Sequence, residues 1–154
     1  MPDTPKIIQT DEQLAAVIHL IVTRQEISQV MGPAISEVLT LLASQGLIPA
    51  GACFSHHIRP PAETFDFEVG FPVVAPVLPA GRVKLSKLPA AKVARTIYRG
   101  GYEGLGAAWG EFNTWLEAAG LDTQDSLWEC YTSGPESSPD SSHWCTELNR
   151  PLKS

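Results

Sequence analysis

Carboxylates that recur near aromatic side chains are the groups of this sequence best suited to chemistry. Glu68 lies in the stretch Glu68-Val69-Gly70-Phe71-Pro72-Val73, and Glu147 in a related stretch, Glu147-Leu148-Asn149-Arg150-Pro151-Leu152. Glu129 and Tyr131 lie shortly before the second stretch. A desolvated carboxylate attracts a cation, and aromatic faces add cation–π attraction of up to about 2 kcal/mol. An empty site of this kind would stay hydrated, or its acid would keep a proton with a raised pKa.

The two acidic stretches are part of a longer internal repeat. Residues 38–47 (VLTLLASQGL) match residues 112–121 (FNTWLEAAGL), so a unit of about half the chain occurs twice. A repeat constrains the whole architecture, because each copy folds as the same unit. We therefore predict modules at about 1–75 and 76–154, related by a pseudo-twofold axis within a single domain of 154 residues.

Each module is expected to contain strands, one helix and one hairpin. The predicted elements are a strand pair across 6–23, a helix at about 29–45, a hairpin at 52–73, strands at 81–87 and 91–99, a helix at about 102–119, and a hairpin made by 126–132 and 143–150. The second helix has apolar residues at helical spacing (Leu105, Trp109, Phe112, Leu116 and Ala119). The fold class is α+β, with eight mostly antiparallel strands and two main helices around a central cleft.

Glycines mark both ends of the second predicted helix. Gly120 is a candidate for the left-handed residue that ends it, and Gly100-Gly101 turns the chain sharply at its start. A phosphate-binding loop is the functional alternative at Gly100-Gly101, but neither the dinucleotide-binding nor the P-loop spacing is met.

Strand alternation assigns the side chains to faces. One face of the first hairpin carries Phe65, Phe67, Val69 and Phe71, which should meet the helices, and the other carries Asp66, Glu68 and Gly70. In the repeated strand Trp144, Thr146 and Leu148 take the apolar side, whereas Glu147 and Asn149 point away from the helices. Glu129 and Tyr131 could join Glu147 and Asn149 on one face if the register allows. Matched faces of two sheets would then line a shared acidic, aromatic cleft.

Composition narrows the class of partner. The net charge of −6 argues against nucleic-acid binding, which needs clustered Lys and Arg. The N-terminus lacks a signal region, no apolar run approaches the roughly 20 residues of a membrane span, and the three cysteines lack a Cys-x-x-Cys spacing. We expect a reduced, soluble, cytoplasmic protein that needs no cofactor.

Metal sites and familiar hydrolase motifs find little support. His56 and His57 are adjacent strand residues that point to opposite faces, so they are interpreted as surface histidines. Cys130, His143 and Cys145 could approach one another on paired strands, but a fourth ligand is not apparent. No serine-nucleophile elbow and no zinc-protease motif is present.

These motifs together resemble the gyrase-inhibitor-like (GyrI-like) family, which also occurs as the effector-binding domain of AraC-type and MerR-type bacterial transcription regulators. The resemblance extends over nearly the whole chain. It is carried by Phe67-Glu68-Val69-Gly70-Phe71-Pro72-Val73, Leu78-Pro79-Ala80-Gly81, Tyr98-Arg99-Gly100-Gly101-Tyr102-Glu103-Gly104-Leu105 with Trp109, Trp128-Glu129-Cys130-Tyr131, Thr146-Glu147-Leu148 and Pro151-Leu152.

The resemblance implies two strand-helix-strand-strand modules and a central groove for hydrophobic, often cationic, small molecules. By position, Glu147 and Glu129 match the family's carboxylates, and Tyr102, Trp109 and Tyr131 match its aromatic walls. Two departures leave the ligand open: Gly100-Gly101-Tyr102 replaces a frequent Gly-Pro-Tyr, and Asn149 replaces an aromatic residue. Trp109 has core packing as its alternative role, and Glu68 a solvated strand position. The candidate ligand-binding residues are Glu147, Glu129, Glu68, Tyr131, Tyr102, Trp109, Tyr98, Phe71 and Asn149.

Three functional hypotheses follow. The first is a stand-alone protein that binds a hydrophobic, often cationic, planar aromatic ligand, as multidrug-binding regulator domains do. The second is a hydrolase that opens the strained cyclopropane ring of DNA-alkylating genotoxins, with Glu147 or Glu68 activating water and Tyr102 or Tyr131 donating to the developing oxygen anion. The third is a protein inhibitor of DNA gyrase. A separate regulator or gyrase is a conceivable protein partner, and edge strands could pair into a homodimer.

Overall fold

The computed structural model describes residues 4–59, 63–134 and 138–153. Within them the chain forms a single eight-stranded antiparallel sheet and two α-helices, which confirms the predicted fold class. The elements are β1 (Lys6–Gln9), β2 (Gln13–Thr23), α1 (Ile27–Ser44), β3 (Phe54–His57), β4 (Thr64–Pro72), β5 (Val83–Leu88), β6 (Lys92–Arg99), α2 (Leu105–Ala118), β7 (Leu127–Ser133) and β8 (Cys145–Pro151).

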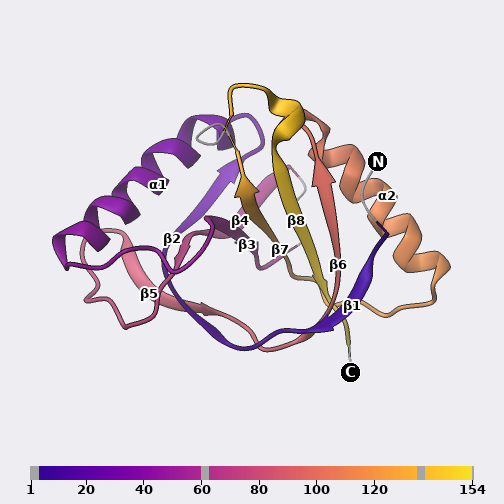
Figure 1. Cartoon of the computed structure of the whole chain (residues 1–154), viewed down its shortest axis with the longest axis horizontal. Coiled ribbons are helices and arrows are strands. Elements are labelled where there is room, and N and C mark those ends of the chain that lie inside the picture. Colours follow the sequence, from indigo (N-terminus) through magenta and orange to yellow (C-terminus); the bar gives the residue numbers. More distant parts are fainter. Residues whose placement is uncertain (1–3, 60–62, 135–137, 154) are drawn as a thin grey trace.

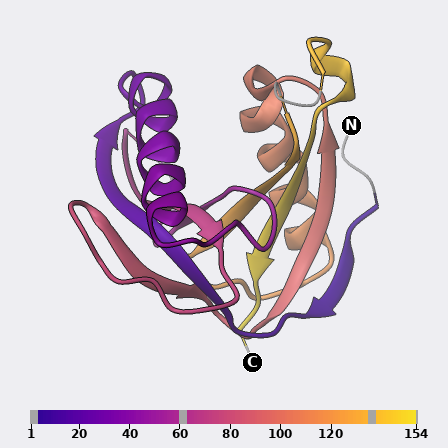
Figure 2. The ribbon, with the colours of Figure 1, turned by 60° about the vertical axis from the view of Figure 1, so that its left-hand side comes forward.

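The order of the strands displays the duplication. The sheet runs β1-β6-β8-β7-β3-β4-β2-β5, and exchanging β1 with β5, β2 with β6, β3 with β7 and β4 with β8 reproduces the same order in reverse. Both helices stand on the same side of the strands, one over each half of the sheet (Figures 1 and 2). We call this side the helix face and the opposite side the far face.

The pseudo-twofold axis passes between two neighbouring strands, β3 and β7. These strands pair with Ser55 opposite Glu129, Phe54 opposite Cys130 and His56 opposite Trp128. Ser55 lies opposite Val69 and Glu129 lies opposite Leu148, and because Val69 and Leu148 each follow one of the repeated acids, Ser55 and Glu129 are counterparts across the axis. The two halves therefore meet through continuous backbone hydrogen bonding, and not as two separate sheets facing a cleft as the sequence had led us to expect.

The first strand of each module pairs with the other module. β1 pairs with β6, and β5 pairs with β2. The strand pair predicted across residues 6–23 is therefore wrong, because β4 and β5 already occupy the two edges of β2. This exchange interlocks the halves and places β1 and β5 at the two edges of the sheet (Figure 1).

The helices lie where the hydrophobic pattern places them. α1 buries Ala34, Val38 and Leu42 against Phe67 and Val69, while partly buried Phe65 and Phe71 join the same cluster. α2 buries Ala108, Phe112 and Leu116 against Ala94 and Leu148. Gly46 (φ 72°) and Gly120 (φ 69°) follow the two helices in the left-handed conformation that glycine adopts without strain, as expected for Gly120.

α1 by itself has the length and composition of a membrane-spanning helix, with 18 residues and a single charged side chain, Glu37. A core helix of a globular domain can have the same properties. In this fold α1 packs along the sheet through one face, so the length and composition of α1 alone are weak evidence for a membrane span.

Candidate functional site

Glu129 is the acid that the fold places on the helix face next to the pseudo-twofold axis. It lies on β7, directly opposite Ser55 of β3, and its side chain points toward α2. Glu129 Oε2 accepts a hydrogen bond of 2.6 Å from Trp109 Nε1, and Oε1 accepts one of 2.8 Å from the Tyr131 hydroxyl. The amphipathic spacing of α2 aims Trp109 at the sheet, and two-residue alternation places Tyr131 on the same face as Glu129.

The carboxyl group of Glu129 is held by neutral donors. Among the described residues, no Lys, Arg or His forms an ion pair with it. Burial raises its pKa above the ordinary value, and the hydrogen bonds from Trp109 and Tyr131 partly oppose that effect. A desolvated carboxyl of this kind would gain from a positive charge placed beside it. The raised pKa agrees with the expectation for a desolvated acid in this position.

Tyr131 connects Glu129 to the other module. Its hydroxyl lies 2.6 Å from Ser55 Oγ, and Ser55 Oγ lies 3.4 Å from His57 Nε2. Ser55 is 1% exposed and His57 is 5% exposed, so this hydrogen-bonded chain is shielded from solvent. The ring of His57 stacks on Phe67 with ring centroids 4.9 Å apart. The interpretation of His57 as a surface histidine is therefore wrong, although its face is opposite to that of His56, as predicted.

Aromatic rings extend the site away from Glu129. Tyr102 meets Tyr131 edge to face at 5.7 Å and Trp144 at 5.1 Å, and we call Tyr102, Tyr131 and Trp144 the aromatic cluster. Tyr102 is 39% exposed, so the cluster reaches the protein surface. Its members come from the segment before α2, from β7 and from the residue before β8.

A glycine turn positions Tyr102. Gly100 has φ 136°, a value that side chains other than glycine rarely adopt, and its backbone N–H donates to Trp144 O at 2.9 Å. The hydroxyl of Tyr98 donates to Gly101 O at 2.7 Å, and a Cβ on Gly104 would overlap that hydroxyl. Tyr98 therefore holds the turn that presents Tyr102, and the phosphate-loop alternative for these glycines gains no support.

The duplicated acids lie on the far face, as alternation predicted. Glu68 Oε2 forms an ion pair of 3.1 Å with Lys84 Nζ, and Glu68 Oε1 accepts a 2.7 Å hydrogen bond from Ser86 Oγ. Glu147 Oε1 forms an ion pair of 3.2 Å with Arg95 Nε. Each acid therefore already has a basic partner from its own chain.

Glu129 and Tyr131 do not share a face with Glu147 and Asn149. In the β7–β8 register Glu129 lies opposite Leu148, and Cys130 lies opposite Glu147. Directly opposed residues point to the same face, so a shift of one residue moves the acid to the other side. The expectation of one face carrying all four side chains is wrong for this reason.

The family model of the GyrI-like small molecule binding domain matches residues 3–153. The chain belongs to the GyrI-like family. No curated protein sequence matches it.

Solved structures share the fold of this GyrI-like domain. The EcmrR C-terminal domain superposes with a TM-score of 0.86 at 22% identity, covering 98% of each chain. In the EcmrR–DNA complex the TM-score is 0.85 at 22% identity, and the match covers 98% of this chain but 57% of EcmrR. SAV2435 bound to tetraphenylphosphonium gives 0.72 at 12% identity, covering 99% and 95%, and a hydrolase from Listeria innocua gives 0.63 at 13% identity, covering 97% and 92%.

The other sequence-predicted site residues have structural surroundings in this GyrI-like domain. Phe71 packs in the α1 cluster. Asn149 is fully buried on the far face, where its Oδ1 accepts a 2.6 Å hydrogen bond from Arg95 Nε. The structure thus brings Glu129, Tyr131, Trp109 and Tyr102 together, with Tyr98 beneath the turn, and it places Glu68, Glu147, Asn149 and Phe71 elsewhere.

Sequence reasoning missed Ser55, His57 and Trp144 as members of the site. The sequence signal for Ser55 and Trp144 was weak, because a serine in a strand and an apolar-face tryptophan are ordinary. Ser55 could have been found by its place opposite Glu129, but that pairing depends on the register between the two modules.

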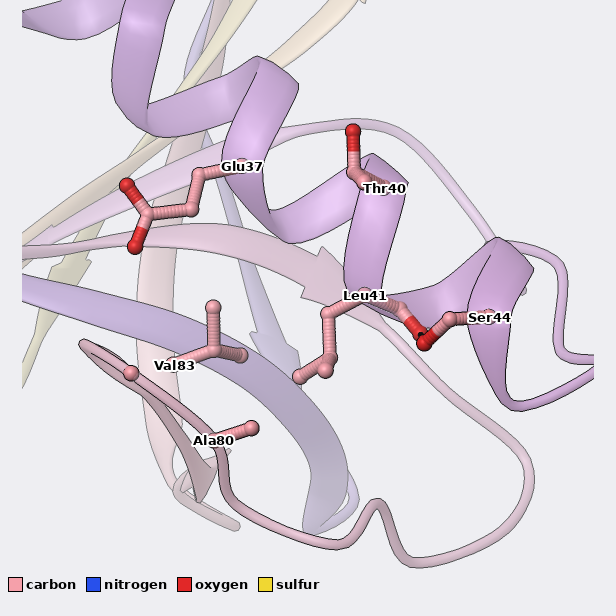
Figure 3. A pocket seen from close by; sticks show the side chains of 7 residues that line it. Glu37, Thr40, Leu41, Ser44, Ala80 and Val83 are labelled. Carbon is pink, nitrogen blue, oxygen red and sulfur yellow. Dashed lines mark hydrogen bonds between the residues drawn. The ribbon is translucent and has the colours of Figure 1, made fainter.

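The domain also has a pocket away from Glu129. An open pocket lies between α1 and the segment around β5, with Leu41 and Val83 beneath it and Glu37 at its side (Figure 3). It is on the β5 edge of the sheet, four strand positions from β7. Among the described residues, no group of three or more His, Cys, Asp or Glu side chains is arranged to hold a metal ion.

Proposed function

We propose that this GyrI-like domain binds a hydrophobic organic cation with planar aromatic groups, and that the cation lies beside Glu129. The observation that carries the proposal is the contrast among three acids. Glu68 and Glu147 have Lys84 and Arg95 as partners, whereas the described partners of Glu129 are the neutral donors Trp109 and Tyr131. A ligand cation would supply the missing positive charge.

The aromatic cluster supports the same ligand class. Tyr102, Tyr131 and Trp144 present ring faces and edges within reach of one another, and Trp109 lies on the other side of the carboxyl group. Aromatic faces attract organic cations by up to about 2 kcal/mol when desolvated. The presence of tetraphenylphosphonium on SAV2435, which has the same fold, makes that cation a suitable first probe.

The test is a titration of intrinsic tryptophan fluorescence with tetraphenylphosphonium. Trp109 and Trp144 lie in the site, so binding should change their emission. Glu129→Gln keeps the shape and removes the charge, and we expect it to weaken binding by roughly tenfold to a hundredfold, equivalent to about 1.4 to 2.8 kcal/mol. Glu147→Gln makes the same chemical change on the far face and serves as the matched control, with affinity expected within about twofold of wild type.

Neutral triphenylphosphine oxide separates the charge contribution from the aromatic one. Its affinity should fall little, or rise, in Glu129→Gln, because it brings no positive charge to the site. An equal loss of affinity for the cation in Glu129→Gln and Glu147→Gln would contradict the assignment of the site to the helix face. Saturable binding of the cation that is insensitive to Glu129→Gln would contradict the role of this acid.

A hydrolase is the second candidate function, and one contact favours it. The 2.8 Å hydrogen bond between Glu129 and Tyr131 places a carboxylate with a raised pKa beside a hydroxyl donor, as acid–base catalysis requires. In that case Glu129 would activate water and the Tyr131 hydroxyl would donate a hydrogen bond to the developing oxygen anion, since Glu147 and Glu68 lie on the opposite face from Tyr102. Product analysis of a cyclopropane-bearing alkylating compound after incubation tests this, with loss of turnover expected in both Glu129→Gln and Tyr131→Phe.

A regulatory role would depend on a partner. EcmrR forms a complex with DNA, and this chain spans 57% of the EcmrR chain. We propose that any transcriptional effect of this domain requires a DNA-binding partner segment, since its own net charge of −6 disfavours contact with DNA.

A further inference from the structure

The side chains of Glu129, Tyr131, Ser55 and His57 form a hydrogen-bonded chain in which each hydroxyl has one hydrogen to donate. The charge state of Glu129 therefore decides which atom donates in each of these hydrogen bonds. Trp109 Nε1 can only donate, so Glu129 Oε2 must remain an acceptor. A proton on Glu129 therefore belongs on Oε1, which faces the Tyr131 hydroxyl at 2.8 Å. The Tyr131 hydroxyl must therefore donate to the charged carboxylate and accept from the protonated carboxyl group.

When Glu129 is charged, the chain donates toward it. Tyr131 has one hydroxyl hydrogen and gives it to Glu129 Oε1. The 2.6 Å contact between Tyr131 and Ser55 then needs the hydrogen of Ser55, because two oxygens at that distance must share one. Ser55 has no hydrogen left for His57, so the bond between Ser55 Oγ and His57 Nε2 is donated by the ring. His57 is then the Nε2–H tautomer, with a bare Nδ1.

When Glu129 is protonated, the three hydrogen bonds between Glu129 Oε1 and His57 Nε2 reverse, while the bond from Trp109 keeps its direction. Glu129 Oε1 donates to Tyr131, Tyr131 donates to Ser55, and Ser55 donates to His57 Nε2. The ring proton of His57 must then reside on Nδ1. The net change is one proton gained by Glu129, while His57 loses a proton at Nε2 and gains one at Nδ1 by exchange with water, so its charge is unchanged.

His57 is the last residue of the hydrogen-bonded chain, and its Nδ1 atom allows both directions of donation. A partner for Nδ1 would lock one tautomer, but within the described residues Nδ1 of His57 is a buried atom without a hydrogen-bond partner. Burial lowers the pKa of His57 to about 4, so the ring is neutral above that pH. Burial also raises the pKa of Tyr131 well above its ordinary value, which keeps its one hydroxyl hydrogen in place.

We propose that His57 is a specificity-determining residue that allows one site to accept both cationic and neutral ligands, because its tautomer follows the charge state of Glu129 through Ser55 and Tyr131. An organic cation selects the charged acid and the Nε2–H ring. A neutral ligand of the same shape binds the protonated acid and the Nδ1–H ring, without leaving a buried hydroxyl unpaired. This inference rests on the proposed function for its ligands, but the coupling itself can be measured without any ligand.

Other charged groups near the chain are few. Asp66 of β4 and the neighbouring His56 act on the His57 ring electrostatically from the far face, and Asp66 is already engaged by His19 and Arg59. Tyr131 faces Cys53, which precedes β3. On α2, the group that contacts Glu129 is the indole of Trp109, which does not titrate. Asp66 is the acidic group that acts on the His57 ring, and an Asp66→Asn variant controls for it.

The experiment is nitrogen-15 NMR of the histidine side chains between pH 5 and pH 9, with the His57 signals identified by their loss in His57→Phe. In wild type we expect the Nε2–H form at high pH and conversion to the Nδ1–H form as Glu129 takes up its proton. Glu129→Gln mimics the protonated acid, since its amide oxygen accepts from Trp109 and its NH₂ donates to Tyr131, so it should hold His57 as Nδ1–H at every pH in the range. Asp66→Asn should leave the wild-type conversion in place.

Ser55→Ala is the decisive variant, because it leaves the bond between Glu129 and Tyr131 intact and cuts the chain before His57. The tautomer should then no longer follow pH. A wild-type ring that keeps one tautomer throughout, or a Ser55→Ala ring that still converts with the wild-type midpoint, would overturn the coupling. Adding tetraphenylphosphonium near that midpoint should shift wild-type His57 toward Nε2–H. Binding without that shift refutes the specificity role alone, whereas absence of binding refutes the ligand class and leaves the pH-dependent coupling standing.

Discussion

The two modules of this domain share a backbone plan and differ in the polar groups beside the axis that relates them. Glu129 and Tyr131 of the second module have Ser55 and His57 as counterparts in the first. The acids on the far face are alike in the two modules, because Glu68 and Glu147 hold equivalent positions and each pairs with a basic side chain. The comparison supports our proposal that the repeated acid serves the structure and that the acid present in only one copy binds the ligand.

Gly70 is the counterpart of Asn149 in the first module, and its substitution is the strongest test of this comparison. Gly70 occupies the equivalent position, opposite Phe54 as Asn149 is opposite Trp128. A Cβ on Gly70 would overlap the backbone oxygen of Ala16 and lie 2.8 Å from Val17 Cα. Backbone cannot yield as a flexible side chain does, so we expect Gly70→Ala to reduce the free energy of unfolding by roughly 3 kcal/mol in urea denaturation.

Gly110→Ala is the control for that substitution. Gly110 lies within α2, where nothing is found within 4 Å of the new Cβ, and alanine favours helix by about 1 kcal/mol over glycine. We expect a small gain in stability. A Gly70→Ala variant as stable as wild type would show that β2 and β4 can separate at no cost, and would weaken the view that the far face is a rigid structural layer.

The elements were predictable because each depends on a local pattern. The i, i+4, i+7 spacing around Phe112 places α2, alternation around Phe67 orients β4, and glycine chemistry explains Gly120. The pairing of β1 was not predictable in the same way. Lys6–Gln9 is short and contacts β6, far along the chain, so its partner is decided by which strand edge the tertiary fold leaves open.

The site was only half predictable for a related reason. Alternation correctly put Glu129 and Tyr131 on one face and Glu147 and Asn149 on one face. Whether those faces coincide depends on the register between β7 and β8, and a shift of one residue reverses the answer. A repeat search also favours what the copies share, so it highlighted Glu68 and Glu147 and passed over Ser55.

His57 allows a second test of the difference between the modules. In the unfolded chain a histidine binds a proton near pH 6.5, whereas burial lowers the pKa of folded His57 to about 4. The unfolded state therefore gains a proton first as the pH falls, and stability is lost between about pH 6.5 and pH 4. We expect this loss to reach roughly 3 kcal/mol in wild type and to be absent in His57→Phe, measured by urea denaturation at pH 7.5 and pH 4.5.

His143→Phe is the control for that measurement, because His143 is exposed. It should retain the acid sensitivity of wild type. Equal acid sensitivity of wild type and His57→Phe would mean that His57 takes up a proton as readily in the fold as in the unfolded chain, and would remove the neutral ring from which the hydrogen-bonded chain is built.

The stabilities of the Glu129 and Glu147 variants test directly whether the two acids have different roles. Glu129 has a raised pKa, so its folded state binds a proton more tightly than the unfolded state, and its contribution to stability is present at low pH and lost as the pH rises through the folded pKa. We expect Glu129→Gln to be more stable than wild type by roughly 1 kcal/mol at pH 8 and to lose that advantage toward pH 4.5. Glu147→Gln removes the partner of Arg95 and should be less stable than wild type by roughly 1 kcal/mol at pH 8.

The two stability changes are expected to have opposite signs, and this difference in sign matters more than their sizes. An acid kept for structure costs stability when it is neutralised, because its basic partner is left half-buried without a charged partner; the Arg95 side chain is 30% exposed and keeps its neutral acceptor Asn149. An acid kept for binding is unfavourable in the empty protein, so neutralising it stabilises the fold and weakens the ligand. If both variants lose stability at pH 8, Glu129 is a structural acid like Glu68 and Glu147, and the cation site must lie elsewhere on the domain.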